Sequence, residues 1–399
     1  MLRNIHKDLY LLAICIFADV VCDNLIVQTY SDLSFRNEKM SLIFITGFVT
    51  LYLVLQIIIA PFQSGLSDFY CRKKSLITAL IFTLGSLTFT YLYDAGIFAT
   101  ILGLFIILLL KSYGNITPIS WAAIADVQKK ELRFALGIAT SPYALSYIIL
   151  GLFNRLSKKT SSDLIIWFFI LVIIIYVIKF FTDPNDIEKR KKRIDSSPLK
   201  KISTEKRAIF KDFRDKIILT GLLGYLCWSI ALYIMLVILV DFGIAHGNAY
   251  AIHMMYGYFI GVLILKFCDK VSDNHIISLG YIVTLVPLIL YFFLKDTTIK
   301  HSLLINIPCV FTGMGNAYLT TAMLTILSKE RKIHEQGRVF GLVESIDTFG
   351  FWLATLIVLF YKIFKPSIHF LIFTSIFIFV LSLIPYLKNV KMRSIRQKS

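Results

Sequence analysis

The sequence predicts an all-α membrane protein with twelve transmembrane helices in two pseudo-symmetric bundles of six. Of its 399 residues, 57% are hydrophobic, compared with roughly 45–50% in soluble domains, and the mean hydropathy is +0.73. An apolar run of about 20 residues is long enough to cross a bilayer. Twelve such runs lie near residues 9–30, 41–63, 75–93, 96–124, 135–156, 164–181, 217–240, 249–267, 276–294, 302–327, 338–361 and 367–387.

One long hydrophilic stretch divides these runs into six and six. We therefore expect an N-terminal bundle over residues 1–181 and a basic cytoplasmic linker over 182–216. A C-terminal bundle over 217–387 and a basic cytoplasmic tail over 388–399 are expected to follow. Twelve spans leave almost no mass for a separate soluble domain.

The net charge of +17 is unevenly distributed along the chain. With the N-terminus inside, 31 of the 42 lysine and arginine residues lie in cytoplasmic segments and 9 in outer loops. This asymmetry follows the positive-inside rule, so both termini are expected in the cytoplasm, with the protein in the cell (inner) membrane. The basic linker is expected to lie under the bilayer, near anionic lipid, and not to bind nucleic acid.

The first predicted span is unusually polar, because it contains Asp19, Asp23 and Asn24. The two acids are four residues apart and share a helix face. Asp19 lies about ten residues inside the span, which is about 15 Å of helix. A carboxylate at that depth normally marks a transport pathway or a proton relay. The alternative is a carboxylate that a fixed partner neutralises.

The span over 96–124 contains Lys111 at a similar depth, followed by Asn115. A lysine inside a membrane needs a partner or water, and Asp19 is the counter-ion that best matches its depth. We interpret these residues as a substrate or proton-coupling site. A permanent salt bridge that only joins the two helices remains the alternative.

A polar stretch over 64–74, interpreted as a turn between two spans, has a recognisable spacing. Its residues Leu66, Ser67, Asp68, Arg72 and Lys73 occupy matching positions of the pattern G-x-L-x-D-R-x-G-R-R. The stretch therefore resembles the loop between the second and third spans of major facilitator superfamily transporters. The two glycines and the first arginine of that pattern are replaced here.

The resemblance implies a cytoplasmic gate around this stretch. In family members, an acid at the position of Asp126 engages the loop arginine, here Arg72, and Lys73 belongs to the same basic pair. Asp68 is expected to accept hydrogen bonds from the start of the span over 338–361, since carboxylates are favoured at helix N-termini. In that span we assign Glu344 to the gate, with membership of a proton path as the alternative.

The second half of the chain repeats the first weakly. Asp269 follows Asp68 by 201 residues, and residues 337–341 follow the similar stretch 133–137 by 204. Two matches at nearly one offset fit the parallel two-half repeat of this superfamily. Asp269 is therefore assigned to the gate as well.

Further polar residues in the second half are candidates for the wall of a central cavity. Trp228, Asn316 and Asp347 join the predicted substrate or coupling group. For Asp347 a role in gating and a role in proton coupling both remain open, and core packing is an equal alternative for the other two.

The family resemblance covers the whole chain and implies a secondary transporter rather than an enzyme. We expect proton-coupled movement of a small polar organic solute, such as an amino acid or a related zwitterionic or cationic metabolite, by alternating access. The alternative is a proton-driven drug or metabolite efflux antiporter, but residues 143–151 lack the proline of the antiporter motif. A non-transporting sensor or a multi-span enzyme fits less well.

Apart from the proton as coupling ion, no cofactor is expected. The six cysteines contain no CxxC pair and the seven histidines are scattered, so no metal site is predicted. We expect a monomer whose partners are the small-molecule substrate and the lipid bilayer.

Overall fold

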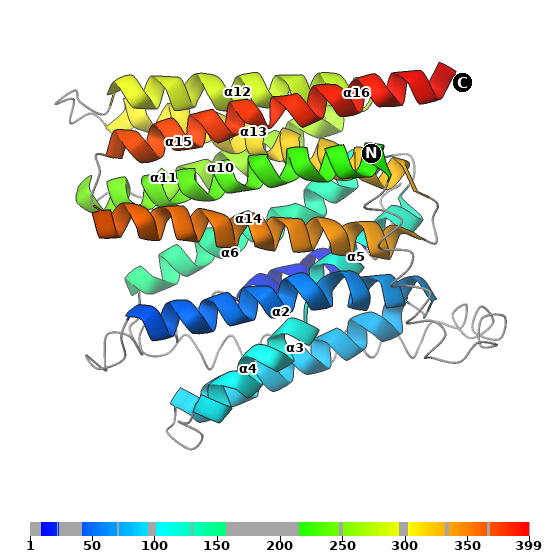
Figure 1. The fold of residues 1–399 in the computed structure, drawn as a ribbon, viewed down its shortest axis with the longest axis vertical. Coiled ribbons are helices and arrows are strands. Elements are labelled where there is room, and N and C mark those ends of the chain that lie inside the picture. Colours follow the sequence, from blue (N-terminus) through cyan, green and yellow to red (C-terminus); the bar gives the residue numbers. More distant parts are fainter. Residues whose placement is uncertain are drawn as a thin grey trace. The chain divides into compact units, whose positions relative to one another are not determined.

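The computed structural model describes residues 9–21, 23, 42–69, 72–94, 101–128, 131–156, 215–246, 250–294, 302–331, 335–364 and 368–398 (Figure 1). Within these ranges the secondary structure is entirely helical. The elements are a first helix Leu9–Val21, then α2 Leu42–Phe69, α3 Arg72–Asp94, α4 Ile101–Tyr113, α5 Thr117–Val127, α6 Leu132–Leu156, α10 Lys216–His246, α11 Tyr250–Leu265, the short 3₁₀ helix η2 Lys266–Cys268, α12 Asp273–Leu294, α13 Ser302–Lys329, α14 Gln336–Phe364, α15 Ile368–Leu381 and α16 Leu383–Lys398.

Where the structure describes them, the predicted spans fall on these helices, and the span over 96–124 is divided between two of them. In the described part of the chain, seven helical segments are long and apolar enough to cross a membrane, and Leu9–Val21 and Ile252–Cys268 form shorter apolar helices. The predicted span over 164–181 lies outside the described residues, as does the linker up to residue 214. The all-α expectation is confirmed.

The chain forms two compact units, and each contains a piece from the other half of the sequence. Unit 1 consists of Met1–Val127, Ile149–Ile209 and Lys332–Ser345. Unit 2 consists of Gln128–Ile148, Phe210–Arg331 and Ile346–Ser399. Unit 1 therefore includes the start of α14, and unit 2 includes most of α6.

The stretch over 64–74 is not the polar turn that the sequence suggested. Helix α2 continues to Phe69, and α3 begins at Arg72. The hydroxyl of Ser67 donates to the backbone carbonyl of Ser64 at 2.5 Å, so this hydroxyl has its hydrogen-bond partner within the helix. Ser64, Ser67 and Asp68 are buried, because this end of α2 packs against the start of α14.

The predicted continuous span over 96–124 is interrupted. Helix α4 ends at Tyr113 and α5 begins at Thr117. The Asn115 side chain accepts a hydrogen bond from the Thr117 backbone N–H at 3.2 Å, as asparagine commonly does in turns with the backbone two residues on. Thr83 donates to the backbone carbonyl of Gly114 at 2.7 Å. Both sides of the break thus have hydrogen-bond partners.

The last predicted span extends into the predicted tail. Helices α15 and α16 run end to end, separated by a turn at Ser382 (Figure 1). The carboxamide of Asn389, in α16, is buried and donates to the backbone carbonyl of Ile217 at 2.5 Å. The basic C-terminal segment is therefore a helix packed on α10.

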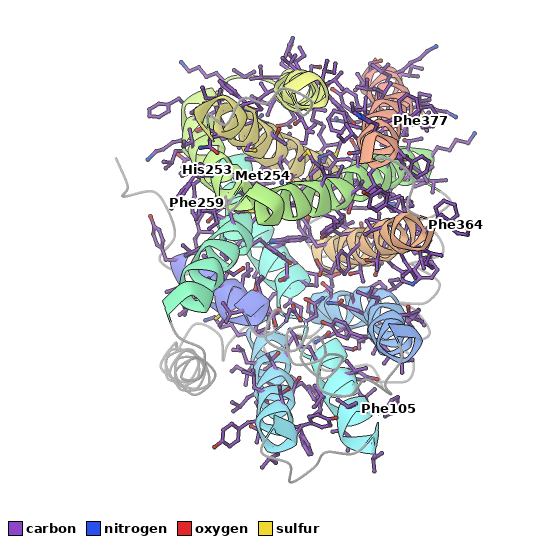
Figure 2. All side chains as sticks on the ribbon, turned by 90° about the vertical axis from the view of Figure 1, so that its left-hand side faces the viewer. Phe105, His253, Met254, Phe259, Phe364 and Phe377 are labelled. Atoms are coloured by element: carbon purple, nitrogen blue, oxygen red, sulfur yellow. The ribbon has the colours of Figure 1, made fainter. Side chains whose placement is uncertain are left out.

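The hydrophobic core of unit 2 gathers side chains from five helices. Met254 of α11, labelled in Figure 2, packs with Cys309 of α13 and Leu371 of α15. Helices α10 and α14 add further apolar residues to the same cluster: Ile230, Ile234, Met235, Ile238 and Ala354.

Helices α11 and α13 approach each other at two glycines. A Cβ atom on Gly313 would collide with the backbone of Met254, and one on Gly257 would collide with the backbone of Val310. Small residues permit this close packing between membrane helices. Gly313→Ala is therefore expected to lower the free energy of unfolding by about 1–3 kcal/mol through overpacking, measured as a lower Tm in detergent.

The matched control for this prediction is Gly85→Ala in α3. A Cβ there would meet only the Leu110 side chain, at 3.4 Å, and alanine has the higher helix propensity by about 1 kcal/mol. Its Tm should be unchanged or higher. Equal Tm values for the two variants would contradict the assigned role of Gly313.

Candidate functional site

A buried ion pair lies at the break between α4 and α5 in unit 1. The Lys111 ammonium, at the end of α4, donates to Asp19 Oδ1. Both residues are only 1% exposed. The pairing predicted from their matching depths is confirmed.

The same carboxylate also binds the last backbone N–H group of the break. Asp19 Oδ2 accepts the Ile116 N–H at 3.1 Å, just before α5 begins at Thr117. The first N–H groups of a helix lack partners within it and favour negative charge. Asp19 therefore forms an ion pair with Lys111 and also accepts a hydrogen bond at the N-terminal end of α5.

A second acid lies next to this pair. Asp23 Oδ1 is 3.3 Å from Lys111 Nζ and accepts the Tyr52 hydroxyl at 2.7 Å. Its side chain is 33% exposed, whereas that of Asp19 is 1% exposed. Lys111 therefore lies between one enclosed carboxylate and one accessible carboxylate. Asn24, the next predicted member of this group, lies outside the described residues.

Unit 1 also brings together two residues that the sequence had assigned to different groups. The Asn115 carboxamide donates to Glu344 Oε1 at 3.2 Å, and both side chains are buried. One turn earlier in α14, the Phe340 ring meets Trp121 edge-on, with 6.0 Å between the centroids. Asn115 thus belongs both to the α4–α5 break and to the contact with α14.

The predicted contact between Asp68 and the start of α14 is present. Asp68 Oδ1 accepts the Gly337 N–H and Oδ2 accepts the Arg338 N–H, each at 2.9 Å. A carboxylate bonded in this way satisfies two N–H groups of the first helical turn. A Cβ on Gly337 would collide with Ser64, Arg72 and Asp68, so this residue must be glycine for α14 to come so close.

Arg72 joins the other members of the predicted gate. It donates to Asp68 and to the Ser67 hydroxyl, and its Nε lies 3.0 Å from Asp126 Oδ2. The predicted pairing with Asp126, at the end of α5, is thus present. Lys73 lies partly exposed in the first turn of α3.

The corresponding junction of unit 2 uses a different acid from the one predicted. Asp269 is exposed directly after η2, whereas Asp273, at the start of α12, is buried. Asp273 accepts Nε–H of Arg133 at 2.9 Å and pairs with Lys329 at 2.6 Å. Arg133 also donates to the carbonyls of Cys268 and Val271. Sequence reasoning missed this cluster, although Arg133 opens the repeated stretch.

Asp347 is held by hydroxyl groups in unit 2. Its Oδ1 accepts the Ser229 hydroxyl at 2.6 Å and its Oδ2 accepts the Tyr233 hydroxyl at 2.8 Å. Within the described ranges it has no basic partner, unlike Asp19. The Tyr233 ring packs edge-on against Phe351, with 4.9 Å between the centroids.

The two remaining candidates are packed in unit 2. Trp228 is 3% exposed and meets the Tyr225 ring edge-on. Asn316 is buried, and its Oδ1 accepts the Thr320 hydroxyl within α13 at 3.1 Å. In the described part of the chain, no group of three or more histidine, cysteine, aspartate or glutamate side chains could hold a metal ion.

Several known proteins share this architecture. The human organic anion transporter MFSD10 (TETRAN) has a TM-score of 0.68 at 12% identity, covering 94% of this chain and 98% of its own. The E. coli fucose:proton symporter FucP has a TM-score of 0.70 at 12% identity, covering 96% and 98%. The proton:xylose symporter XylE bound to 6-bromo-6-deoxy-D-glucose has a TM-score of 0.66 at 12% identity, covering 95% and 94%.

The sequence matches no curated protein, but it does match a family model. The Major Facilitator Superfamily model aligns with residues 11–355, which is most of the chain, and identifies the family that the stretch over 64–74 suggested. The structural neighbours share its helical fold at low sequence identity. The chain therefore belongs to the Major Facilitator Superfamily and is a multi-pass membrane transporter, not an enzyme.

Proposed function

We propose that this transporter is a symporter that couples proton entry to the uptake of a small polar organic solute. The observation that carries the proposal is the Asp19–Lys111 ion pair, which is buried at a helix break inside the membrane. Intramembrane ionisable residues are rare and usually serve transport or proton relay. The fold accommodates such coupling, since FucP and XylE are described as proton symporters.

In this mechanism Asp19 exchanges its ion pair for a proton. A protonated Asp19 no longer neutralises Lys111, so the lysine can bind an anionic group of the substrate. The Ile116 N–H, which Asp19 accepts at 3.1 Å, becomes available to the same group. Return of the proton to water restores the ion pair and displaces the substrate. The Asp19 carboxylate therefore occupies, between cycles, the place of a substrate carboxylate.

A substrate that suits this site carries both charges. Lys111 and the start of α5 would bind a carboxylate, since a half-helix N-terminus favours anions. Asp23, which is partly exposed beside Lys111, would bind an ammonium or hydroxyl group, together with Asn24. We therefore propose an amino acid or a related zwitterionic or cationic metabolite as the substrate.

The gate residues complete the proposal. We propose that Asp68, Arg72, Lys73, Asp126 and Glu344 hold the cytoplasmic side closed in one state of an alternating-access cycle, and release it in the other. The Arg133–Asp273 cluster, in which Nε and the carboxylate are 2.9 Å apart, would do the same in unit 2. Asp347, whose carboxylate accepts hydrogen bonds from the Ser229 and Tyr233 hydroxyls, would serve as a second proton-carrying group.

Purified protein in liposomes tests this function. A thermal-shift screen against a metabolite library first selects solutes that raise the Tm. Each solute is then added to liposomes that contain a trapped pH-sensitive dye. Symport predicts that the solute acidifies the lumen of right-side-out vesicles, with no response in protein-free vesicles. Alkalinisation of the lumen when the solute is added, or solute movement without proton movement, would contradict the proposal.

Topology provides a second prediction. We propose that both termini and the linker over 182–216 face the cytoplasm of a monomer in the cell membrane, between bundles over 1–181 and 217–387. The asymmetry of 31 cytoplasmic to 9 outer basic residues supports it. Reporter fusions after Lys192 and after Arg396 should both be active only as cytoplasmic reporters. An external reporter active at either position would rule out this span count.

A further inference from the structure

Helices α15 and α16 present one continuous apolar stripe on the outside of unit 2. Phe373, Phe377, Ile384 and Leu387 follow one another at helical spacing and are 53–64% exposed. Phe377 lies on the outer side of its helix in Figure 2. In a membrane protein such a stripe faces the acyl chains of lipids.

Helices α15 and α16 together are longer than the hydrocarbon core of a bilayer. The segment His369–Arg396 contains 28 residues, which corresponds to about 42 Å at 1.5 Å per residue. The hydrocarbon core of a bilayer is only about 30 Å thick, or about 20 helical residues. The last turns of α16 therefore reach the layer of lipid headgroups.

At this depth the stripe changes from apolar to basic. Lys388 and Lys391 are exposed and continue the face of Ile384 and Leu387. In the described ranges, neither lysine has a carboxylate partner. Lys216, at the start of α10, is also exposed. The next residue, Ile217, accepts a hydrogen bond from Asn389 through its carbonyl, and Asn389 lies between Lys388 and Lys391 in α16. This contact brings the start of α10 next to the two lysines.

The opposite face of α16 is fixed to unit 2. The Tyr386 hydroxyl donates to the Asn274 carbonyl at 2.9 Å, and Arg393 Nε lies 2.9 Å from Glu330 Oε1. Asn389, which is 3% exposed, lies on the same inner face between Tyr386 and Arg393. These contacts orient the helix so that Lys388 and Lys391 remain on its outer face.

We propose that α16 binds the headgroup of an anionic phospholipid through Lys388, Lys391 and Lys216. The acyl chains of that lipid would lie along Ile384, Leu387 and the phenylalanines of α15. Three ammonium groups attract a lipid with net negative charge, whereas the choline of a zwitterionic lipid adds a repelled cation. This proposal depends only on the membrane fold, and it holds whichever solute the protein transports.

Photo-crosslinking in nanodiscs tests the site. The protein is reconstituted in nanodiscs that contain equal amounts of phosphatidylglycerol and phosphatidylcholine, each with a photoreactive group near the headgroup. Peptides that carry crosslinked lipid are identified by mass spectrometry. Each lysine near an anionic surface favours the anionic lipid by roughly fivefold. Peptides from residues 383–398 should therefore carry several times more phosphatidylglycerol than phosphatidylcholine.

Three variants separate a headgroup site from general surface charge. Lys388→Gln with Lys391→Gln should bring the lipid ratio on α16 close to one. Lys388→Arg with Lys391→Arg should retain the preference. Lys270→Gln, which removes an exposed lysine before α12, should leave the ratio unchanged. Equal labelling of α16 by both lipids in the wild type, or an unchanged ratio in the double glutamine variant, would overturn the proposal.

Discussion

Asp19→Asn is expected to abolish solute accumulation driven by a pH gradient, while the protein still folds and binds its substrate. Asparagine has nearly the shape of aspartate but cannot exchange a proton in the working pH range. It can still accept the Ile116 N–H, as Asp19 does at 3.1 Å. The proposed exchange of proton for lysine therefore stops, and only equilibration or solute–solute exchange should remain.

The neighbouring carboxylate explains why this variant should fold. Removing one member of a buried ion pair commonly costs about 3–5 kcal/mol, because the other charge is left without a partner. Here Lys111 retains Asp23, whose Oδ1 lies 3.3 Å from its ammonium. We therefore expect a lower Tm but a folded, monodisperse protein. Lys111→Gln should be more harmful to binding, because it removes the group proposed to hold the substrate anion.

Two measurements decide between coupling and a purely structural ion pair. Uptake of labelled solute into liposomes is measured with and without an inward proton gradient, and counterflow exchange is measured without a gradient. If the pair only joins two helices, Asp19→Asn with Lys111→Gln should restore stability and retain gradient-driven uptake. The coupling model predicts that this double variant remains uncoupled.

Asp215→Asn provides the matched control for this experiment. It also neutralises an aspartate in an ion pair, since Asp215 Oδ2 lies 3.2 Å from Arg331. This pair belongs to unit 2, whereas the break between α4 and α5 belongs to unit 1. Gradient-driven uptake should therefore be preserved in Asp215→Asn. Accumulation by a well-folded Asp19→Asn protein would remove Asp19 from the mechanism.

The sequence predicted the fold because the main constraint on a membrane helix is the length of its apolar run. Depth along such a run also predicted which charges meet. Asp19 and Lys111 are 92 positions apart, yet each lies near the middle of its span, and an unpaired charge there is costly. The pairings of Asp68 and Arg72 were predictable for another reason, since their spacing resembles a known family loop.

The break between α4 and α5 could not be predicted in the same way. Gly114, Asn115 and Pro118 are local signals for a helix end, but polar residues also occur inside continuous membrane helices. The break is stabilised by partners from other helices, namely Thr83 at the Gly114 carbonyl and Asp19 at the Ile116 N–H. Backbone groups freed inside a membrane need such tertiary partners.

The unit 2 junction shows where repeat reasoning is insufficient. The offset of 201 residues aligned Asp269 with Asp68, but the 3₁₀ turn η2 leaves Asp269 exposed. Asp273, one helical turn later, is the acid that receives Arg133. The local helix geometry after α11 decides which of the two acids is buried. The spacing of residues in the sequence does not predict this geometry.

Asp68→Asn is expected to reduce the transport rate by at least about tenfold, with little change in substrate affinity. The two Asp68 oxygens accept the Gly337 and Arg338 N–H groups, each at 2.9 Å. An asparagine can accept only one of them and turns an NH₂ group toward the other. Hydrogen bonds to a charged acceptor contribute about 1.5–3 kcal/mol each, so the loss corresponds to roughly a tenfold or larger shift between conformational states.

The side chains around Asp68 make this effect specific to the gate. Arg72 would keep Asp126, at 3.0 Å, but would lose the carboxylate that it shares with the start of α14. The solute-binding residues proposed above are not altered, so the Kd from a thermal-shift titration should stay within a few-fold of the wild-type value. The turnover rate of Asp68→Asn in liposomes should fall. Asp68→Glu should also transport more slowly than the wild type, because its longer side chain does not fit in the close contact with Gly337.

Glu335→Gln is the control, since it neutralises an acid at the start of the same helix without breaking the buried contact. Glu335 pairs with Arg338 at 3.2 Å, and its side chain is 35% exposed. Water reaches the Glu335 carboxylate and weakens its ion pair with Arg338, whose side chain is 9% exposed. The transport rate of Glu335→Gln should therefore remain near that of the wild type. A rate for Asp68→Asn as high as that of Glu335→Gln would show that the Asp68 contact positions α14 without controlling the transport cycle. A loss of substrate binding together with the rate would instead assign Asp68 to the folding of unit 1.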